Sequence, residues 1–362
     1  MILFVIILLG LVLKTSYRNP DFKNKNYFFL FLTIVAIHAF AFFINYKFLE
    51  GEDTRVFYNR ALTATDWFGL FKIGSRSMSF IIYPLTKFGF SYFDIALLCS
   101  IISLKGYFIY LNFLFKKVKP FSIYHFLLII FFCYPSLHIW TTSLYKESIL
   151  FTLMAIILKQ LWSIKPFNYK LLFSILIITL IRPYISLIII LSIIIIYHKV
   201  IIKEYKIASF LLLSLITVTV VKFLNILNLS SFKTNFERII NYSSNNGNSS
   251  IDLLNSNYFE RLFLVIFRPL FYDSKTFFQF FVSIENFLFL IILIFFAYKL
   301  YNQKPNFRLI DKHIRFAVLF SVTCILFYSI YMYNLGLASR MRVMFIPFLL
   351  IGMFNMLSLK KM

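Results

Sequence analysis

The chain has 362 residues, of which 60% are hydrophobic and 14% are charged, and its mean hydropathy is +0.82. An ordinary soluble domain carries about 25% charged residues, so this composition excludes a soluble globular fold and favours a lipid bilayer. The net charge of +23 does not indicate a nucleic-acid-binding face, because the lysines and arginines form short clusters between long apolar runs. Such clusters are typical of membrane topology signals.

Long apolar runs predict the membrane spans, because a helix needs roughly 20 apolar residues to cross about 30 Å of hydrocarbon. In chain order these runs lie near residues 1–13, 27–46, 91–114, 121–137, 147–162, 171–181, 184–198, 207–225, 276–298, 316–334 and 341–358. We therefore expect an all-α, polytopic integral membrane protein with about eleven transmembrane helices. Because no soluble segment interrupts them, 1–362 is predicted to be a single transmembrane domain.

The basic clusters predict the orientation of the spans. They lie at 14–25, 116–119, 159–170, 199–206, 299–315 and 360–361. Strict alternation through eleven helices places every cluster in the cytoplasm if the N-terminus lies outside, and the C-terminus is then cytoplasmic. The first apolar run is followed rather than preceded by positive charge, so it is interpreted as a spanning helix and not as a secretory signal.

Three further features complete the predicted topology. Basic loops flank 171–202 on both sides, so this run should form two short helices that turn at Arg182-Pro183. The segments 77–90 and 258–272 are apolar but short, and they are predicted to be re-entrant or interfacial helices on the outer face. The outer loops are expected at 47–76 and 226–260.

Cysteine usage argues against metal or redox chemistry. Cys99, Cys133 and Cys324 each lie inside an apolar stretch, and their spacing fits neither a disulfide framework nor a metal site. We therefore expect no metal and no cofactor.

Basic side chains also occur where the positive-inside rule disfavours them, in outer loops and at outer helix ends. Five separated segments carry six of them: Arg55, Lys146, Arg182, Arg268, Arg340 and Arg342. Other polar side chains accompany them in the same segments: Asp53, Tyr58, Arg60, His138, Trp140, Glu147 and Tyr184. Ionisable groups at membrane depth cost several kcal/mol unless they face a cavity or a partner, so we expect the basic groups to converge in one pocket.

Arginine forks bind phosphate oxygens bidentately and stay charged, so such a pocket suits a diphosphate whose charge grows as a glycosidic bond breaks. A polyprenyl diphosphate fits this description. Each residue also has a plainer interpretation. An outer arginine often binds a lipid phosphate, Asp53 can pair with Arg55 or Arg60, Glu147 can cap its helix beside Lys146, and His138 can be interfacial. Three charged residues inside apparent helices are interpreted as interhelical pairs or cavity-lining groups: Asp94, Lys105 and Glu285.

Several of these motifs resemble the Wzy-type bacterial polysaccharide polymerases, which make O-antigen, capsule or exopolysaccharide, and especially their EpsG-like branch. The motifs are Gly51-x-Asp53 followed by Tyr58, arginines on Arg-Pro turns, and a late Gly336-x-x-x-Arg340-x-Arg342. The predicted topology and length are similar as well. Two departures are that Lys146-Glu147 stands where a further arginine-centred motif is expected, and that the long outer loop is shorter than in many polymerases.

The resemblance implies a glycosyltransferase with a GT-C-like fold in the bacterial inner (cytoplasmic) membrane, working without metal or nucleotide sugar. It would polymerise undecaprenyl-diphosphate-linked oligosaccharide repeat units on the extracytoplasmic face, beside a flippase and a chain-length regulator. The six basic residues would bind the diphosphate, and Asp53, His138 or Glu147 would be the base that deprotonates the acceptor hydroxyl. Tyr58, Trp140 and Tyr184 would bind the acceptor sugar.

Two other functions remain open at this point. A glycosyltransferase that uses a polyprenyl-phosphate sugar carries an acidic pair such as Glu52-Asp53, but there the acidic loop follows the first helix and works with a metal. A transporter or flippase for lipid-linked oligosaccharide also needs a cationic cavity. It usually shows two related halves, and we find no such duplication in the sequence.

Overall fold

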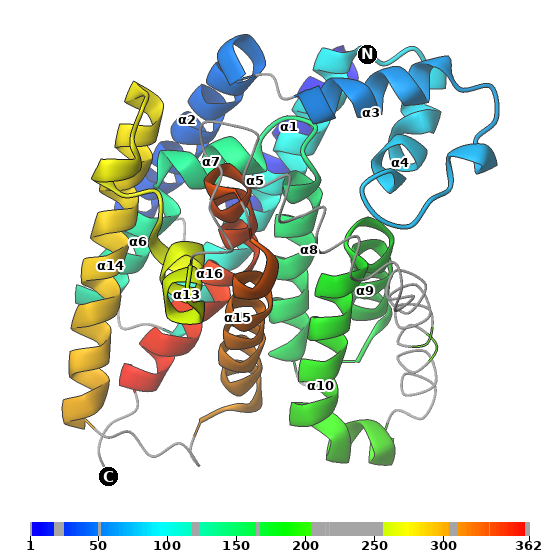
Figure 1. Cartoon of the computed structure of the whole chain (residues 1–362). Helices are drawn as coiled ribbons and strands as arrows, with labels where there is room; N and C mark the ends of the chain where they lie inside the picture. Colours follow the sequence, from blue (N-terminus) through cyan, green and yellow to red (C-terminus); the bar gives the residue numbers. More distant parts are fainter. Residues whose placement is uncertain are drawn as a thin grey trace. The chain divides into compact units, whose positions relative to one another are not determined.

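A computed structural model describes residues 2–17, 25–49, 52–117, 123–163, 167–204, 214, 217, 256–303, 310–332 and 334–358. In these ranges the helices are joined by turns and loops and there is no β-strand, which confirms the predicted all-α class (Figure 1). The chain divides into two compact units, unit 1 (Met1–Pro183) and unit 2 (Tyr184–Met362).

Six of the described helices are long and apolar enough to cross a membrane. They cover Tyr27–Leu49, Tyr92–Phe113, Pro183–Lys203, Phe277–Asn302, Lys312–Ile330 and Leu335–Leu357. Val5–Thr15 and Tyr169–Ile181 form shorter apolar helices. The chain therefore has the character of a polytopic membrane protein, whereas the number eleven is not confirmed. The expected span at 207–225 lies outside the described residues, apart from two isolated positions.

Unit 1 contains the following elements in chain order: α1 (Ile2–Tyr17), α2 (Lys25–Ile44), η2 (Asn45–Leu49), α3 (Glu52–Thr63), η3 (Phe68–Leu70), α4 (Ser77–Lys87), α5 (Tyr92–Lys117), α6 (Ile123–Phe132), α7 (Pro135–Thr141), α8 (Lys146–Leu161) and α9 (Tyr169–Ile181). Helix α5 packs against α1, α2 and α8, while α3 packs on α4 and α8 on α9. Much of the predicted outer loop at 47–76 is thus helical.

The helices α5 and α8 approach each other closely at Gly106. A Cβ atom added there would lie 2.7 Å from the Oγ1 atom and 3.0 Å from the Cα atom of Thr152. Small residues permit such contacts between membrane helices, and interhelical hydrogen bonds reinforce them. The Thr152 hydroxyl donates such a bond to the Ile102 carbonyl of α5 at 2.6 Å.

Where the sequence predicts one span at 121–137, the structure has a break. Helix α6 ends at Phe132, Tyr134 is extended, and Pro135 begins α7. Proline disfavours a helical conformation at the preceding residue but is well suited to the first position of a new helix. Helix α7 is paired with the following helix, α8, rather than with α6. The chain bends by 104° between α7 and α8, so these two helices form a broken span or a re-entrant loop.

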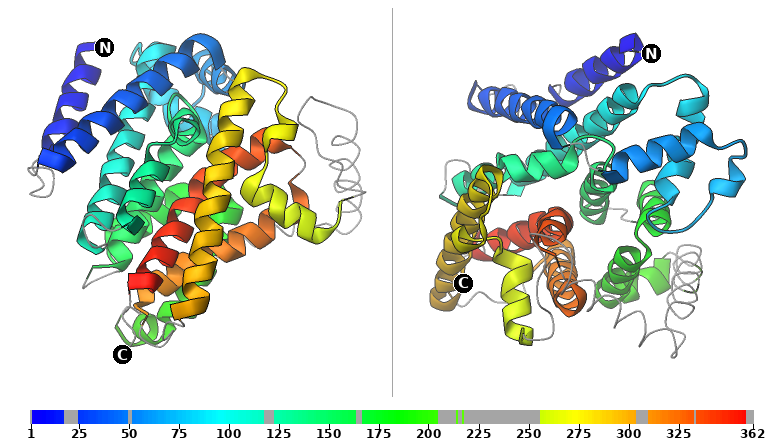
Figure 2. Two further views of the ribbon diagram at one scale, coloured as in Figure 1. Left: turned by 90° about the vertical axis from the view of Figure 1, so that its left-hand side faces the viewer. Right: turned by 45° about the horizontal axis from the view of Figure 1, so that its top comes forward.

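Unit 2 contains α10 (Pro183–Glu204), α13 (Tyr258–Phe267), η4 (Phe271–Asp273), α14 (Phe277–Gln303), α15 (Lys312–Tyr331) and α16 (Leu335–Ser358). Helices α15 and α16 lie side by side, and α13 and α14 both pack on α16 (Figure 2). A Cβ atom at Gly352 would lie 2.6 Å from the Cγ2 atom of Val318, so the α15–α16 pair also depends on a close approach. As predicted, the run from 171 to 202 is divided into two helices, with Arg182 between α9 and α10.

Candidate functional site

The structure gathers sequence-distant charged residues inside each unit. We call Ser75, Lys146, Glu147 and Arg182 the unit 1 cluster. We call Arg268, Asp273, Asn286 and Arg342 the unit 2 cluster.

The turn between α7 and α8 positions the unit 1 cluster. Ser143 has a φ of 63°, a sparsely populated conformation for a residue other than glycine. Its N–H donates to the Ser100 hydroxyl of α5 at 2.8 Å, and its carbonyl accepts from the Ser148 hydroxyl at 2.8 Å. These contacts hold the turn on both sides, so α8 begins at Lys146 in a fixed position.

Two cations and one carboxylate meet at this helix start. Glu147 is fully buried in the first turn of α8, where the helix dipole favours a negative charge. The guanidinium of Arg182, at the end of α9, donates to its carboxylate. The ammonium of Lys146 donates to the Ser75 hydroxyl at 3.1 Å and lies 5.4 Å from the centre of the Phe57 ring.

The unit 1 cluster thus joins three of the segments that the sequence placed on the outer side: the 47–76 region, the start of α8 and the Arg182 turn. A backbone hydrogen bond of 2.7 Å from Gly74 to the Leu180 carbonyl also connects the first and third. Of its ionisable residues, Lys146 and Arg182 are cationic and Glu147 is anionic. Positive charge of this kind attracts anions.

Other predicted unit 1 residues lie elsewhere in the unit. Asp53 and Arg55 are exposed on α3, and Arg55 covers the Tyr92 ring at 5.4 Å. Tyr58 packs edge-on against the same ring, and Trp140 packs against Tyr145.

His138 is 0% exposed and lies in the interior of unit 1, beside His38 of α2. Its Nε2 atom is 2.9 Å from the Phe132 carbonyl, and its Nδ1 atom is 3.0 Å from the Nδ1 of His38. Both ring nitrogens therefore have partners within the protein. Of the three candidate bases, Asp53 is the one whose carboxylate lies on an exposed face, because Glu147 is buried against Arg182.

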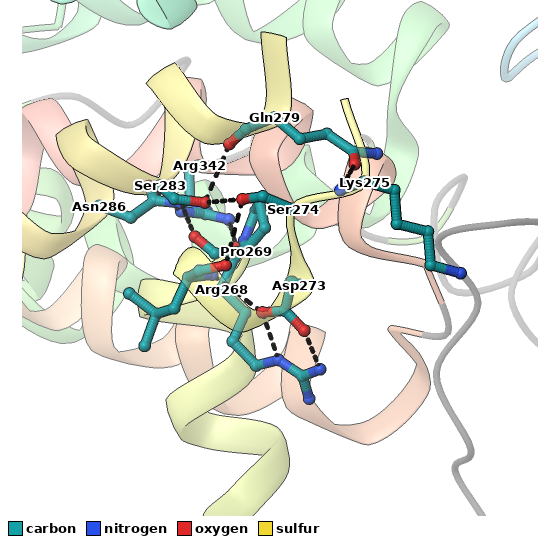
Figure 3. A network of polar contacts seen from close by, with 10 residues as sticks. Arg268, Pro269, Asp273, Ser274, Lys275, Gln279, Ser283, Asn286 and Arg342 are labelled. Atoms are coloured by element: carbon teal, nitrogen blue, oxygen red, sulfur yellow. Dashed lines mark hydrogen bonds and ion pairs between the residues drawn. The ribbon is translucent and has the colours of Figure 1, made fainter. Parts of the chain in front are cut away.

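The unit 2 cluster forms where α13 ends (Figure 3). A capping box of Asn257 and Glu260 begins α13, and Arg268 terminates it. The Arg268 guanidinium forms a two-pronged ion pair with Asp273, in which Nε donates to Oδ2 at 3.0 Å. Asp273 also accepts from the Leu270 N–H at 2.8 Å, so one carboxylate fixes both the arginine and the turn that follows it.

Hydrogen bonding and charge from Asp273 raise the pKa of Arg268 above its ordinary value. The guanidinium consequently stays charged at every physiological pH. Its side chain is 28% exposed, so an anion outside the cluster can reach it.

Arg342 of α16 is buried and contacts the turn that begins at Arg268. It donates to the Asn286 side chain at 2.7 Å and to the Arg268 carbonyl, while the Asn286 amide donates to the Pro269 carbonyl at 2.7 Å. Arg342 also interacts electrostatically with Glu285 of α14. Its contacts go to the protein itself, so Arg342 holds the Arg268 turn in place. Arg340, two residues earlier, is partly exposed.

Sequence reasoning missed three partners in these clusters, Ser75, Asp273 and Asn286, and also His38, the partner of His138. Asp273 had a local signal, because it follows Arg268 by five residues across a proline turn. The other three come from distant helices or loops, which no spacing rule links. Tyr184 lies in unit 2, stacked on Phe327 with ring centres 5.7 Å apart.

The fold and the composition define a helical integral membrane protein. Comparison of the chain with protein-family models, curated proteins and solved structures gives no match.

Proposed function

We propose that this protein is a polysaccharide polymerase that joins undecaprenyl-diphosphate-linked oligosaccharide repeat units on the extracytoplasmic face of the bacterial cytoplasmic membrane. A hydroxyl of the acceptor unit attacks the anomeric carbon of the donor chain, and the bond to the lipid diphosphate breaks. The hydroxyl proton passes to a base, and the diphosphate leaves with the bonding electron pair. The reaction forms one glycosidic bond and needs no metal.

One observation carries this proposal: in unit 1, Arg182 pairs with the buried carboxylate of Glu147, and the neighbouring Lys146 donates to the Ser75 hydroxyl of a distant segment. Fixed cations stabilise the charge that develops on a departing diphosphate without reorganisation during the step. The residues proposed to bind the diphosphate in unit 1 are Lys146 and Arg182. In unit 2, Arg268 and Arg340 are each proposed to bind anionic groups of the lipid-linked substrate, with Arg342 acting through the Arg268 turn.

Asp53 is the proposed general base. It stands on an exposed face of α3, and Phe57, one helical turn later, contacts Lys146. A carboxylate there is accessible to an acceptor hydroxyl. Tyr58 on the same helix is proposed to bind the acceptor sugar.

The proposed topology has eleven spans, with the N-terminus outside, the C-terminus in the cytoplasm, and α4 and α13 as interfacial or re-entrant helices. This orientation places the start of α8 and the ends of α9 and α13 on the outer side. A flippase that delivers the lipid-linked units and a chain-length regulator are the proposed partners.

Deletion of the gene in its own host tests the proposed function. The expected result is loss of polymer together with accumulation of single repeat units on lipid at the outer face. Accumulation at the inner face would instead identify a flippase. Polymer synthesis in isolated membranes that stops on chelation of divalent metal would favour the polyprenyl-phosphate-sugar glycosyltransferase.

Complementation with variants then tests the cluster. In the deletion strain, the Lys146→Met variant should be inserted and abundant but should not restore polymer synthesis. The Lys170→Met variant should restore polymer synthesis, because Lys170 is an exposed residue at the start of α9. Normal polymer with Lys146→Met would remove the unit 1 cluster from the mechanism.

A further inference from the structure

Two histidines face each other inside unit 1, at a depth where ionisable groups are costly. His38 lies near the middle of the candidate span Tyr27–Leu49, and His138 lies on α7. They are 4% and 0% exposed, and their Nδ1 atoms are 3.0 Å apart. A contact this short between two nitrogens requires one proton between them, because two bare lone pairs or two N–H groups would repel each other.

The other ring nitrogen of His138 fixes its tautomer. Its Nε2 lies 2.9 Å from the Phe132 carbonyl, which only accepts hydrogen bonds. Nε2 must therefore carry a proton. In the neutral ring Nδ1 is then bare, so the proton between the two histidines comes from His38.

The surroundings of His38 allow two proton arrangements. Its Nε2 lies 3.0 Å from the Ser103 hydroxyl and 2.9 Å from the Ser100 carbonyl. The Ser103 hydroxyl also lies 2.9 Å from that carbonyl. When both rings are neutral, Ser103 donates to the bare Nε2 of His38, and Nδ1–H of His38 donates to His138. The bare Nε2 then also faces the Ser100 carbonyl, another acceptor, at 2.9 Å, and this unfavourable contact makes Nε2 the preferred position for an added proton.

An added proton fits at the Nε2 of His38 without movement of any heavy atom. The new N–H is donated toward the Ser100 carbonyl and the Ser103 oxygen, and the Ser103 hydroxyl rotates toward the same carbonyl. The Nδ1–Nδ1 proton stays in place and spreads the charge over both rings. A second added proton would put an N–H on both facing nitrogens, so the pair accepts one proton and no more.

Neighbouring groups accommodate the resulting cation. Tyr107 of α5 stacks on His138 with ring centres 4.2 Å apart and meets the edge of His38. An aromatic face stabilises a cation lying over it. The charged groups on the adjoining helices have partners elsewhere: Glu147 on α8 with Arg182, Asp94 on α5 with Ser91, and Lys105 on α5 with Thr15.

We propose that His38 and His138 form a single proton-binding site within the membrane-embedded part of unit 1, which takes up one proton per protein through the Nε2 atom of His38. The geometry of the pair and its two serine partners carries this inference. It does not rest on the proposed function.

Solid-state NMR of the whole protein, labelled with ¹⁵N-histidine in proteoliposomes, tests the site directly. We expect a through-bond correlation between two imidazole Nδ1 nuclei, with opposite tautomers for the two rings at neutral pH. On acidification both rings should change in one step as the Nε2 of His38 becomes protonated. His198, exposed on α10, is the internal control and should show no correlation to a second imidazole.

His38→Gln and His138→Gln assign the signals, and each should abolish the correlation. If either variant does not fold, the correlation in the unaltered protein still identifies the pair. The proposal is overturned if no Nδ1–Nδ1 correlation is found, if both rings have the same tautomer, if they titrate as two independent sites, or if neither takes up a proton on acidification.

Discussion

The guanidinium of Arg342 donates a hydrogen bond to the backbone carbonyl of Arg268, which lies 74 residues earlier in the chain. Through this bond α16 determines where the chain turns after α13. The two arginines thus have different tasks: Arg268 presents a partly exposed charge, and Arg342 fixes the backbone that carries it.

Removal of the buried arginine should therefore destabilise unit 2. Arg342→Ala leaves the Asn286 side chain and the Arg268 carbonyl without their donor, and hydrogen bonds to charged groups contribute roughly 1.5–3 kcal/mol each. We expect a clearly lower unfolding temperature in detergent micelles. Lys275→Ala, exposed in the same unit after the Arg268 turn, is the control and should unfold almost like the unaltered protein. Equal unfolding temperatures for the two variants would contradict the assigned role of Arg342.

The Glu147–Arg182 pair predicts non-additive stability. Both side chains are buried, so removing one partner leaves the other charge uncompensated, at a cost of about 3–5 kcal/mol. Glu147→Gln and Arg182→Met should each lower the unfolding temperature markedly, whereas the double variant should recover part of the loss. A double-mutant cycle measures this coupling. Strictly additive losses would show that the two residues do not act as a pair.

The Arg268–Asp273 pair predicts that lysine cannot replace the arginine. The fork of Arg268 binds both carboxylate oxygens, which a single ammonium does not reproduce. If the proposed function holds, Arg268→Ala and Arg268→Lys should both lose polymer while remaining in the membrane, as judged by gel electrophoresis of polysaccharide and immunoblotting. Lys275→Ala, exposed two residues after Asp273, should keep normal polymer. Full polymer length with Arg268→Lys would mean that charge alone is needed there.

Composition and charge were sufficient to predict the class of fold. Apolar runs located five of the six long helices directly, and Arg182-Pro183 correctly marked the division before the sixth, α10. Hydropathy failed at 121–137, where Pro135 ends one helix and begins another inside an apolar run. Average hydropathy over a window does not register a break of two residues, although the proline itself was visible.

The candidate site was only partly accessible from the sequence. The positive-inside rule identified Lys146, Arg182 and Arg268 as unusual, and the structure gives each a buried or partly buried contact. Their partners depend on which helix faces meet, and no pattern in a single sequence contains that information. His138 shows the same limitation, because its neighbour His38 lies 100 residues earlier, in an apolar run without charged residues.

The last prediction concerns the aromatic surface of the η3–α4 region, where rings from both elements stack. Trp67 lies over Phe80 and Tyr83, with ring centres 5.4 Å and 6.1 Å away, and its indole N–H is already donated to the Phe80 carbonyl. Phe68 is 75% exposed, and Lys72 and Arg76 beside it are exposed as well. Exposed rings among basic groups are typical of the membrane interface, in agreement with the proposed interfacial position of α4.

With Trp140 and Trp162 replaced by Phe, Trp67 becomes the single tryptophan and reports the environment of this surface. In proteoliposomes its fluorescence should be quenched strongly by lipids brominated near the headgroup and weakly by aqueous iodide, because an interfacial indole lies against acyl chains rather than in water. Phe68→Ser should shift this balance toward iodide by removing the most exposed ring, whereas Thr63→Ser, exposed at the end of α3, should leave it unchanged. Strong iodide quenching with no effect of brominated lipid would place the η3–α4 region in the aqueous phase, and the proposed interfacial position of α4 would then be wrong.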